Sequence, residues 1–419
     1  MEWKEVRLGD VCEIFGRIGF RGYTTNDLVD TPKEGAISLS PKNIINGELN
    51  LEQCTYIKWD KYYESPEIMI NPNEIVITKT GSSVGRTTFV RRVVHPMTLN
   101  PQLVVLKNIS ENAEFLSYYI KSALFQSVLK SIVVGSAIPT LSQKNLANIM
   151  IKLPKEVNDQ HRIASILSSL DRKIELNNKI NADLEEMAQA IFKNWFVDFE
   201  PFKDGKFVDS ELGMIPEGWK VGKITDIGCL ITDYVSNGSF ASLKQNVHLY
   251  ETKEYAQFIR NTDLKTNTFS VYVDKHSYDF LSKSTLYGNE IIISNVGDVG
   301  SVHLCPKLDI PMTLGNNIIM LRPNEKEYNY FLYLWFKYFS GQGLIQGIKG
   351  GSAQPKFNKT DFKNLPLLIP SFEIIEKSYW IFESMFSILS SNVKESSRLS
   401  TLRDTLLPRL MSGELEVPE

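Results

Sequence analysis

The feature that most constrains the fold of this chain is an internal repeat. Residues 73–81 (NEIVITKTG) return as residues 289–297 (NEIIISNVG), at an offset of 216 residues. Residues 135–139 (GSAIP) likewise return as residues 351–355 (GSAQP). A repeat of this length is far longer than the about 20–50 residues of a solenoid unit. Each copy is therefore a whole domain followed by a segment of its own, and the chain carries two similar surfaces.

The composition is that of an ordinary globular protein. Of the 419 residues, 42% are hydrophobic and 23% are charged, and no apolar run approaches the about 18 residues of a membrane span. The four cysteines are far apart and lack CxxC spacing, which argues against a disulfide framework and against a zinc site. The start MEWKEVRLGD lacks the pattern of a signal peptide, so we expect a cytoplasmic protein.

Charge is distributed unevenly along the chain, whose net charge is −3. Residues 1–155 carry 18 Lys and Arg against 15 Asp and Glu, and residues 212–370 carry 16 against 14. The segment after each of these bodies is acidic. A mildly basic body can contact phosphate groups. Charge scatter over solvated surfaces produces differences of the same size, so this pattern alone leaves both interpretations open.

Each body combines short strands with a helix. Runs rich in Val and Ile, bounded by Gly, Pro and Asn, are typical of strands, and helical segments follow them at 115–129 and 331–339. These patterns predict two tandem α/β (α+β) domains of about 150 residues. Two long coiled-coil-like helices would join them in a pseudo-two-fold repeat. The predicted domains are 1–155 and 201–370, with an entry linker at 201–217, and the predicted helical segments are 156–200 and 371–419.

A heptad stripe predicts a long helix after each body. The first segment has no proline or glycine between residues 158 and 199, which predicts a helix about 60 Å long. We expect Pro408 to end or kink the second helix and Gly413 to stop it. Mutual pairing of the two stripes is the favoured prediction, and packing against the bodies is the alternative. The predicted pairing positions are Ile163, Leu167, Leu170, Ile174, Asn177, Asn181, Leu184, Ile191, Trp195, Phe386, Leu389, Val393, Leu399, Leu402 and Leu406.

Two of these positions are polar. Asn177 and Asn181 follow the apolar spacing, and a buried Asn in such a seam fixes the register because it penalises misaligned pairings. A seam that is hydrated at this point is the alternative interpretation.

The sequence holds no recognisable catalytic motif. It lacks GxSxG, a Walker loop, HExxH, and GxGxxG after a strand. The NPx triplets at Asn71 and Asn100 lack the aromatic residue that an amino-methyltransferase stacks on its flipped base. Glu251 and Lys253 form a triplet of the kind found in nucleases, but no partner acid is identifiable. These observations favour a binding protein with no catalytic residue and no metal ligand.

Polar side chains gather in the loops of the bodies. Residues 78–86 (TKTGSSVGR) place Lys79 and Arg86 beside two glycines, where a phosphate can be seated; an ordinary turn with glycines at positive φ is the alternative. Arg, Asn and Gln also read base edges, and the two copies differ in these residues. The candidate nucleic-acid contacts are Arg17, Arg21, Lys42, Asn43, Lys79, Thr80, Ser82, Ser83, Arg86, Asn237, Lys244, Gln245, Arg260, Asn261, Asn295, Gln354 and Lys356.

Several segments, taken in order, carry a resemblance to a known family. They are residues 191–202 (IFKNWFVDFEPF), 211–221 (ELGMIPEGWKV) and 406–415 (LLPRLMSGEL), together with the paired GSAxP segments. With these segments the chain resembles the specificity subunit of type I restriction–modification enzymes over its whole length.

The resemblance implies a specific division of labour. Each recognition domain would read one half of a split target in double-stranded DNA, and the helices would pack antiparallel as a spacer. The helices would also dock two methyltransferase subunits, which carry S-adenosylmethionine. Motor-nuclease subunits, which use ATP and Mg, would join them. This chain would itself bind no cofactor and catalyse no reaction.

Three alternatives remain open on the sequence alone. The first is a specificity subunit of a modification-only assembly that has no nuclease. The second is a stand-alone nuclease that uses Glu251 and Lys253. The third is a coiled-coil scaffold that does not bind nucleic acid.

Overall fold

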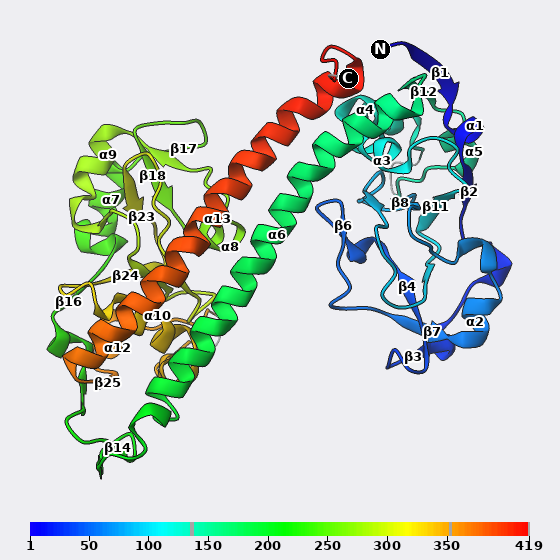
Figure 1. Cartoon of the computed structure of the whole chain (residues 1–419). Helices are drawn as coiled ribbons and strands as arrows, with labels where there is room; N and C mark the ends of the chain where they lie inside the picture. Colours follow the sequence, from blue (N-terminus) through cyan, green and yellow to red (C-terminus); the bar gives the residue numbers. More distant parts are fainter. Residues whose placement is uncertain (135–137, 352–353, 418–419) are drawn as a thin grey trace. The chain divides into compact units, whose positions relative to one another are not determined.

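The computed structural model describes residues 1–134, 138–351 and 354–417 (Figure 1). The chain forms two compact units: unit 1 comprises residues 1–176 with 395–419, and unit 2 comprises residues 177–394. Both boundaries fall inside the long helices. Each unit therefore contains one body and a part of each helix, whereas the sequence pattern predicts the helices as separate segments.

Unit 1 contains the first body and its small terminal sheet. Its strands and helices are β1 (Trp3–Arg7), α1 (Leu8–Val11), β2 (Glu13–Phe15), β3 (Leu28–Val29), β4 (Gly35–Leu39), β5 (Ile44–Ile45), β6 (Glu48–Leu49), β7 (Tyr56–Lys58), α2 (Trp59–Tyr63), β8 (Ile75–Thr78), β9 (Thr87–Phe89), β10 (Met97–Leu99), β11 (Leu103–Lys107), α3 (Ala113–Lys121), α4 (Ala123–Ile132), α5 (Gln143–Ala147) and β12 (Met150–Pro154). Helix α6 (Val157–Phe196) begins in unit 1 and ends in unit 2.

Unit 2 contains the second body. Its strands and helices are β13 (Phe207–Val208), β14 (Ile215–Pro216), β15 (Lys220–Lys223), β16 (Cys229–Asp233), α7 (Phe240–Asn246), β17 (Leu249–Tyr250), β18 (Ala256–Ile259), α8 (Asn261–Thr266), β19 (Tyr272–Val273), α9 (Lys275–Phe280), β20 (Thr285–Leu286), β21 (Ile291–Ser294), β22 (Val302–Leu304), β23 (Met312–Leu314), β24 (Ile318–Pro323), α10 (Tyr328–Lys337), α11 (Phe339–Gly347), α12 (Lys359–Lys363) and β25 (Pro366–Ile369). Helix α13 (Phe372–Ser412) begins in unit 2 and ends in unit 1.

The sheets confirm that the two bodies share one fold. In unit 1, an antiparallel sheet has the order β2-β11-β8-β9, and a mixed sheet has the order β10-β4-β7-β3 with β10 parallel to β4. In unit 2, the corresponding orders are β16-β24-β21-β22 and β17-β19-β18-β23-β20, with β18 parallel to β23. The pair β15–β25 likewise repeats the pair β1–β12. Strand β20 extends the mixed sheet of unit 2.

Side-chain contacts repeat as well. Gln126 Nε2 donates a hydrogen bond to Gly85 O at 3.1 Å, and Gln342 Nε2 donates one to Gly300 O at 3.0 Å. Both glycines have φ of +90°, a backbone conformation that favours glycine. The same side chain thus holds the same turn in both units.

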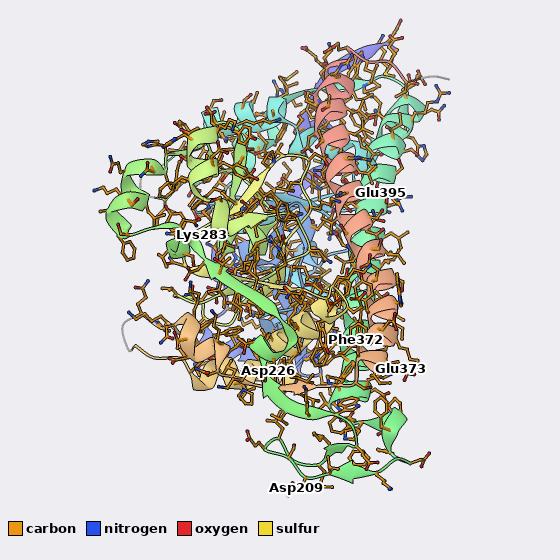
Figure 2. The ribbon with its side chains drawn as sticks, turned by 90° about the vertical axis from the view of Figure 1, so that its left-hand side faces the viewer. Asp209, Asp226, Lys283, Phe372, Glu373 and Glu395 are labelled. Carbon is orange, nitrogen blue, oxygen red and sulfur yellow. The ribbon has the colours of Figure 1, made fainter. Side chains whose placement is uncertain are left out.

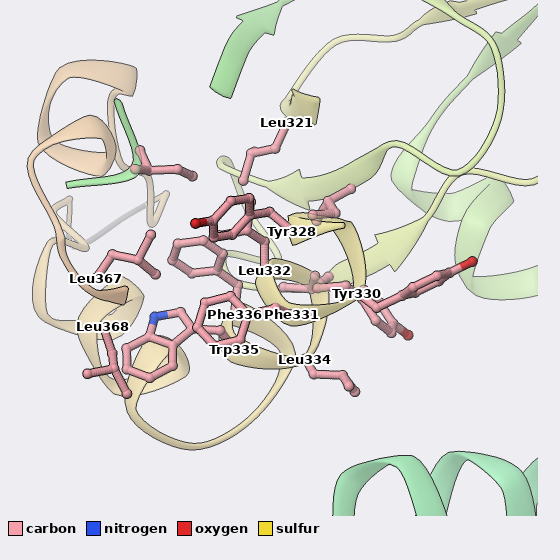
Figure 3. Close-up of a cluster of buried hydrophobic side chains, with 14 of the residues drawn as sticks. Leu321, Tyr328, Tyr330, Phe331, Leu332, Leu334, Trp335, Phe336, Leu367 and Leu368 are labelled. Carbon is pink, nitrogen blue, oxygen red and sulfur yellow. The ribbon is translucent and has the colours of Figure 1, made fainter. Parts of the chain in front are cut away.

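The core of unit 2 is rich in aromatic side chains (Figure 3). Phe331, Trp335 and Phe336 of α10 are each at most 2% exposed, and they pack with Leu367 and Leu368 of β25. Burying an aromatic side chain removes about 150–250 Å² from water. Helix α10 is therefore the centre of this core.

The two long helices pair with each other, as the stripe predicted. Helices α6 and α13 have 40 and 41 residues, which corresponds to about 60 Å each. In unit 1, Arg403 pairs with Asp171 at 2.7 Å and Lys173 with Glu395 at 3.2 Å. From Asp171 to Lys173 the residue numbers of α6 rise, while those of their partners in α13 fall from Arg403 to Glu395. The two helices are therefore antiparallel. Figure 2 shows Phe372 and Glu373 at the start of α13 and Glu395 farther along it.

The apolar residues of α6 contact the bodies as well as the other long helix. Ile163 and Leu167 are buried in the core of unit 1, and Phe192 and Phe196 are buried in the core of unit 2. Both interpretations of the stripe therefore apply, at different positions along each helix.

The predicted pairing positions differ in burial. Ile163, Leu167, Asn177 and Phe386 are buried, Leu402 is exposed, and Leu170, Ile174, Asn181, Leu184, Ile191, Trp195, Leu389, Val393, Leu399 and Leu406 are half-buried. Leu402 is exposed, whereas its neighbour Arg403 turns inward to pair with Asp171. This exposure argues against helix pairing at Leu402, and subunit docking there stays a prediction.

The prediction that Pro408 ends or kinks the second helix was wrong about the end. Helix α13 continues through Pro408 to Ser412, and Gly413 follows with φ of +78°. A proline removes one backbone donor, whose usual acceptor lies four residues earlier. Here Asp404 is exposed, so water can satisfy its carbonyl group. Among the described helices, none is long and apolar enough to cross a membrane.

Candidate functional site

The ends of four strands meet at one edge of unit 1. The Asn100 N–H, after β10, donates to Leu39 O at the end of β4 at 2.8 Å. The Lys79 N–H, after β8, donates to Gln102 O at 2.8 Å. Arg17, after β2, donates to Leu99 O. The loops at 16–27, 40–46, 79–86 and 100–102 therefore form one surface, which we call the loop edge of unit 1.

The same edge exists in unit 2. The Gly315 N–H donates to Ile259 O at 2.8 Å, and the Asn295 N–H donates to Asn317 O at 3.1 Å. These bonds are the counterparts of the two backbone bonds in unit 1. The loops at 234–239, 260–267, 295–301 and 315–317 form the loop edge of unit 2.

A tight turn stands at the centre of each edge. In unit 1 it spans residues 79–86, and the Gly81 N–H donates to Pro139 O at 2.9 Å. In unit 2 it spans residues 295–301, and the Gly297 N–H donates to Pro355 O at 2.9 Å. Both glycines have positive φ, +102° and +77°. They serve the backbone of the turn, as the simpler interpretation of the sequence held.

The turn of unit 1 carries two cations. Arg86 is exposed, and Lys79 is half-buried, so that burial lowers the pKa of its ammonium group. Within the described residues neither side chain forms an ion pair. Ser82 is exposed, while Thr80 and Ser83 are half-buried.

Arg17 is buried, contrary to the role predicted for it. Its guanidinium donates to Leu99 O at 2.8 Å, Thr98 Oγ1 at 3.2 Å and Arg21 O at 3.1 Å. It therefore ties the loop after β2 to β10, and its side chain is covered by the protein. Arg21 is half-buried and lies 3.4 Å from Glu67.

Three other candidates also hold the loops in place. Asn43 is buried, and its Oδ1 accepts from the Ser40 N–H at 3.0 Å. Asn237 Nδ2 donates to Ser284 Oγ at 2.8 Å. Arg260 binds Asp263 through two nitrogen atoms, at 3.0 and 2.6 Å. These side chains shape the edges, and contact between them and a nucleic acid stays a prediction.

The remaining candidates lie at or near the surface. Lys42, Lys244, Gln245, Gln354 and Lys356 are exposed, and Asn261 and Asn295 are half-buried. Of the GSAxP segments, residues 135–137 and 352–353 lie outside the described residues.

Sequence reasoning missed an acidic residue in the turn of unit 2. Asp298 is 51% exposed and pairs with Lys265 at 2.6 Å. Aligning the two copies residue by residue would have found it, because Asp298 stands where unit 1 has Ser82.

The helix seam contains one more asparagine than predicted. In unit 2, Asn392 Nδ2 donates to Asn181 Oδ1 at 2.9 Å. Asn177 Nδ2 donates to Asn392 O and Asn181 Nδ2 to Leu389 O, each at 3.5 Å. The amide groups bond across the seam, which favours the register interpretation over a hydrated gap.

The described residues hold no group of three or more His, Cys, Asp and Glu side chains placed to bind a metal ion. Glu251 and Lys253 are exposed.

Comparison with known proteins identifies the family. Residues 1–186 and 216–399 match the family described as type I restriction modification DNA specificity domain. The type I restriction enzyme MjaIX specificity subunit of Methanocaldococcus jannaschii is 28% identical over 437 residues, covering 100% of this chain and 94% of that protein. The type I restriction enzyme HindI specificity subunit of Haemophilus influenzae is 24% identical over 485 residues, covering 99% and 100%.

A solved structure shares the fold. The crystal structure of the type I restriction–modification S subunit from M. genitalium matches with a TM-score of 0.61 at 17% identity. The match covers 98% of this chain and 96% of that one. The family match over residues 1–186 and 216–399 shows that the chain belongs to the type I restriction–modification DNA specificity family.

Proposed function

We propose that this chain is the non-catalytic subunit that reads DNA sequence for a type I restriction–modification complex. Each unit would bind one half of a bipartite target in double-stranded DNA through its loop edge. One observation supports this proposal most directly. The two loop edges have the same pattern of backbone hydrogen bonds but carry different side chains. Such a pair reads two different half-sites with one docking geometry.

Polar side chains on the edges and elsewhere on the two bodies suit this task. Lys79, Arg86 and Lys356 can contact phosphates, which position a protein on DNA without reading its sequence. Gln245 and Gln354 are exposed amides of the kind that read adenine. Because phosphate contacts release counterions, binding should weaken steeply as salt rises.

The paired helices would act as a spacer between the half-sites. The asparagine bonds at the seam support a single register, and a fixed register gives a fixed gap. We expect that inserting seven residues after Asn181, with seven matching residues before Leu389, lengthens the recognised gap by about three base pairs, since seven helical residues span about 10.5 Å and a base pair rises about 3.4 Å. The measurement is methylation mapping, with unaltered half-sites as the internal control. An unchanged gap in a folded variant would refute the spacer role.

The partners follow from the same proposal. Two methyltransferase subunits carrying S-adenosylmethionine would dock on the helices, and motor-nuclease subunits using ATP and Mg would join them. Exposed apolar side chains on the helices support docking, among them Leu176, Met187 and Ile388, which are about half exposed. Large apolar groups facing water are typical of partner surfaces when they gather on one face.

Single-molecule sequencing tests the function directly. The chain is expressed with its cognate methyltransferase subunit in a host that lacks its own modification. We expect adenine methylation on a split motif, lost when this chain is omitted. A soluble complex that produces no new motif would contradict the proposal and favour a scaffold without DNA. Restriction of unmodified phage in the native strain separates a full system from a modification-only assembly.

A further inference from the structure

The two central turns share their pair of glycines with positive φ, although the turn of unit 2 is one residue shorter, and they carry opposite charge. The turn of unit 1 has two cations without an ion pair in the described chain, and the turn of unit 2 has one anion. From unit 1 to unit 2, the replacements are Lys79 to Asn295, Ser82 to Asp298 and Arg86 to Ser301.

Asp298 is held in place as an ionised acceptor. Its Oδ2 atom accepts from Lys265 Nζ at 2.6 Å and from Asn261 Nδ2 at 3.2 Å. Its pKa is lowered, first by the hydrogen bond from Lys265 and less by those from Asn261 and Ser301. The Oδ1 atom takes no part in the Lys265 and Asn261 contacts. About half of the side chain is exposed.

Two acceptor atoms on residues around Asp298 also lack a donor. Asn261 Oδ1 and Asn295 Oδ1 are buried, and neither accepts a hydrogen bond from the described residues. A buried acceptor without a donor costs free energy, so native proteins rarely leave one without a reason. The half-exposed carboxylate of Asp298 therefore suits the turn of unit 2 to a ligand that donates hydrogen bonds, and Lys79 and Arg86 suit the turn of unit 1 to an anion.

We propose that the two turns divide the work of DNA binding, which rests on the function proposed above. The turn of unit 1 binds phosphates through Lys79 and Arg86. The turn of unit 2 reads a base, with Asp298 accepting a hydrogen bond from the exocyclic amino group of cytosine.

Base chemistry selects cytosine over adenine. In the major groove cytosine presents an N4 donor, whereas adenine presents its N6 donor beside the N7 acceptor. A carboxylate has only acceptor atoms, so its second oxygen atom would face N7 and be repelled. Guanine and thymine present acceptors at this edge and no amino donor. Lys265 offsets the repulsion between Asp298 and the phosphates.

The test uses the complex with the cognate methyltransferase subunit and measures DNA affinity against salt and against single-base variants of the mapped target. The double variant Lys79→Gln with Arg86→Gln should make the plot of log affinity against log salt less steep, by about 2 units of slope. The reason is that each phosphate contact contributes about −0.9 to this slope. The recognised motif should not change. Asp298→Asn should leave the slope nearly unchanged and reduce the preference for cytosine at one position about tenfold.

Matched variants make the outcome decisive. Ser82→Asn changes the equivalent position of unit 1 and should alter neither slope nor motif. Asp298→Ser, which installs the residue found in unit 1, serves if Asp298→Asn fails to assemble. An unchanged motif in both Asp298 variants would overturn the base contact, and an unchanged slope in the Lys79 and Arg86 variant would overturn the phosphate contact. If the parent complex itself binds DNA without salt dependence or a split motif, the proposed function fails and not only the division between turns.

Discussion

The two units hold the long helices by different chemistry. In unit 1, Tyr118 Oη donates to Asp171 Oδ2 at 2.5 Å, and Arg403 donates to Asp171 Oδ1 at 2.7 Å. In unit 2, Phe192 and Phe196 of α6 pack on Phe331, with ring centroids 5.7 and 5.0 Å apart. Both units also bury apolar side chains of α6, and unit 2 has a polar contact of its own with α13, from Tyr330 Oη to Glu383 at 2.6 Å. The difference is that unit 2 adds ring contacts with α6. We call the contacts of Asp171 the polar joint of unit 1, and the contacts of Phe192 and Phe196 with Phe331 the aromatic joint of unit 2.

The aromatic joint should give the largest effect when it is broken. Phe331→Ala removes a side chain that is 1% exposed and leaves a cavity between α6 and α10. We expect a loss of about 3–5 kcal/mol in the free energy of unfolding of unit 2. Urea denaturation combined with hydrogen exchange locates the loss.

The equivalent residue of unit 1 provides the comparison. Phe115 is also buried, but it stacks on Tyr119 within its own helix and not on a ring of α6. Phe115→Ala should destabilise the body of unit 1 without increasing exchange in α6. Equal exchange in α6 for both variants would show that the two joints do not differ.

The polar joint should give an intermediate effect. Asp171→Asn removes the charge that Arg403 and Tyr118 share and leaves one donor without an acceptor. We expect a loss of about 1.5–3 kcal/mol in unit 1, as for hydrogen bonds to charged groups. Thermal unfolding measures it. Lys173→Gln, which removes an ion pair whose two side chains are each 44% exposed, should cost less than about 1 kcal/mol. Equal losses would mean that Asp171 acts only as a surface charge.

Acid should reveal the smallest difference between the units. Burial lowers the pKa of His303 from 6.5 to about 4, and the equivalent residue of unit 1 is Thr88, which does not titrate. The unfolded chain therefore takes up a proton below pH 6.5 before the folded chain does, so this residue lowers stability as the pH falls from 6.5 towards 4.

The size of this effect follows from partial burial. We expect about 1–2 kcal/mol, after allowing for the solvent that reaches the ring. Unfolding of His303→Thr and of the parent at several pH values measures the difference. Identical pH profiles would show that His303 titrates normally in the folded protein.

Much of the fold was predictable because its signals are periodic. The offset of 216 residues gave two bodies, and the heptad spacing gave two paired helices. The candidate site was predictable only as a set of loops. Arg17 and Asn43 match the residue types that bind DNA, yet both are buried. Arg17 donates a hydrogen bond to Leu99, which lies 82 residues away in the sequence. No local sequence pattern predicts such a contact.

The sequence by itself determined the repeat, the strands, the helical stripes and the family. It did so because these depend on order and spacing along the chain. Only the tertiary structure decided which polar side chains remain available to a partner. The availability of a side chain depends on which strand ends lie together. A side-chain donor that is already bonded to a carbonyl group inside the protein, as Arg17 is to Leu99, cannot also bond a partner with that hydrogen. Asp298 is an example of a side chain that remains available. Lys265 and Asn261 of α8 bond its carboxylate and hold it at the surface.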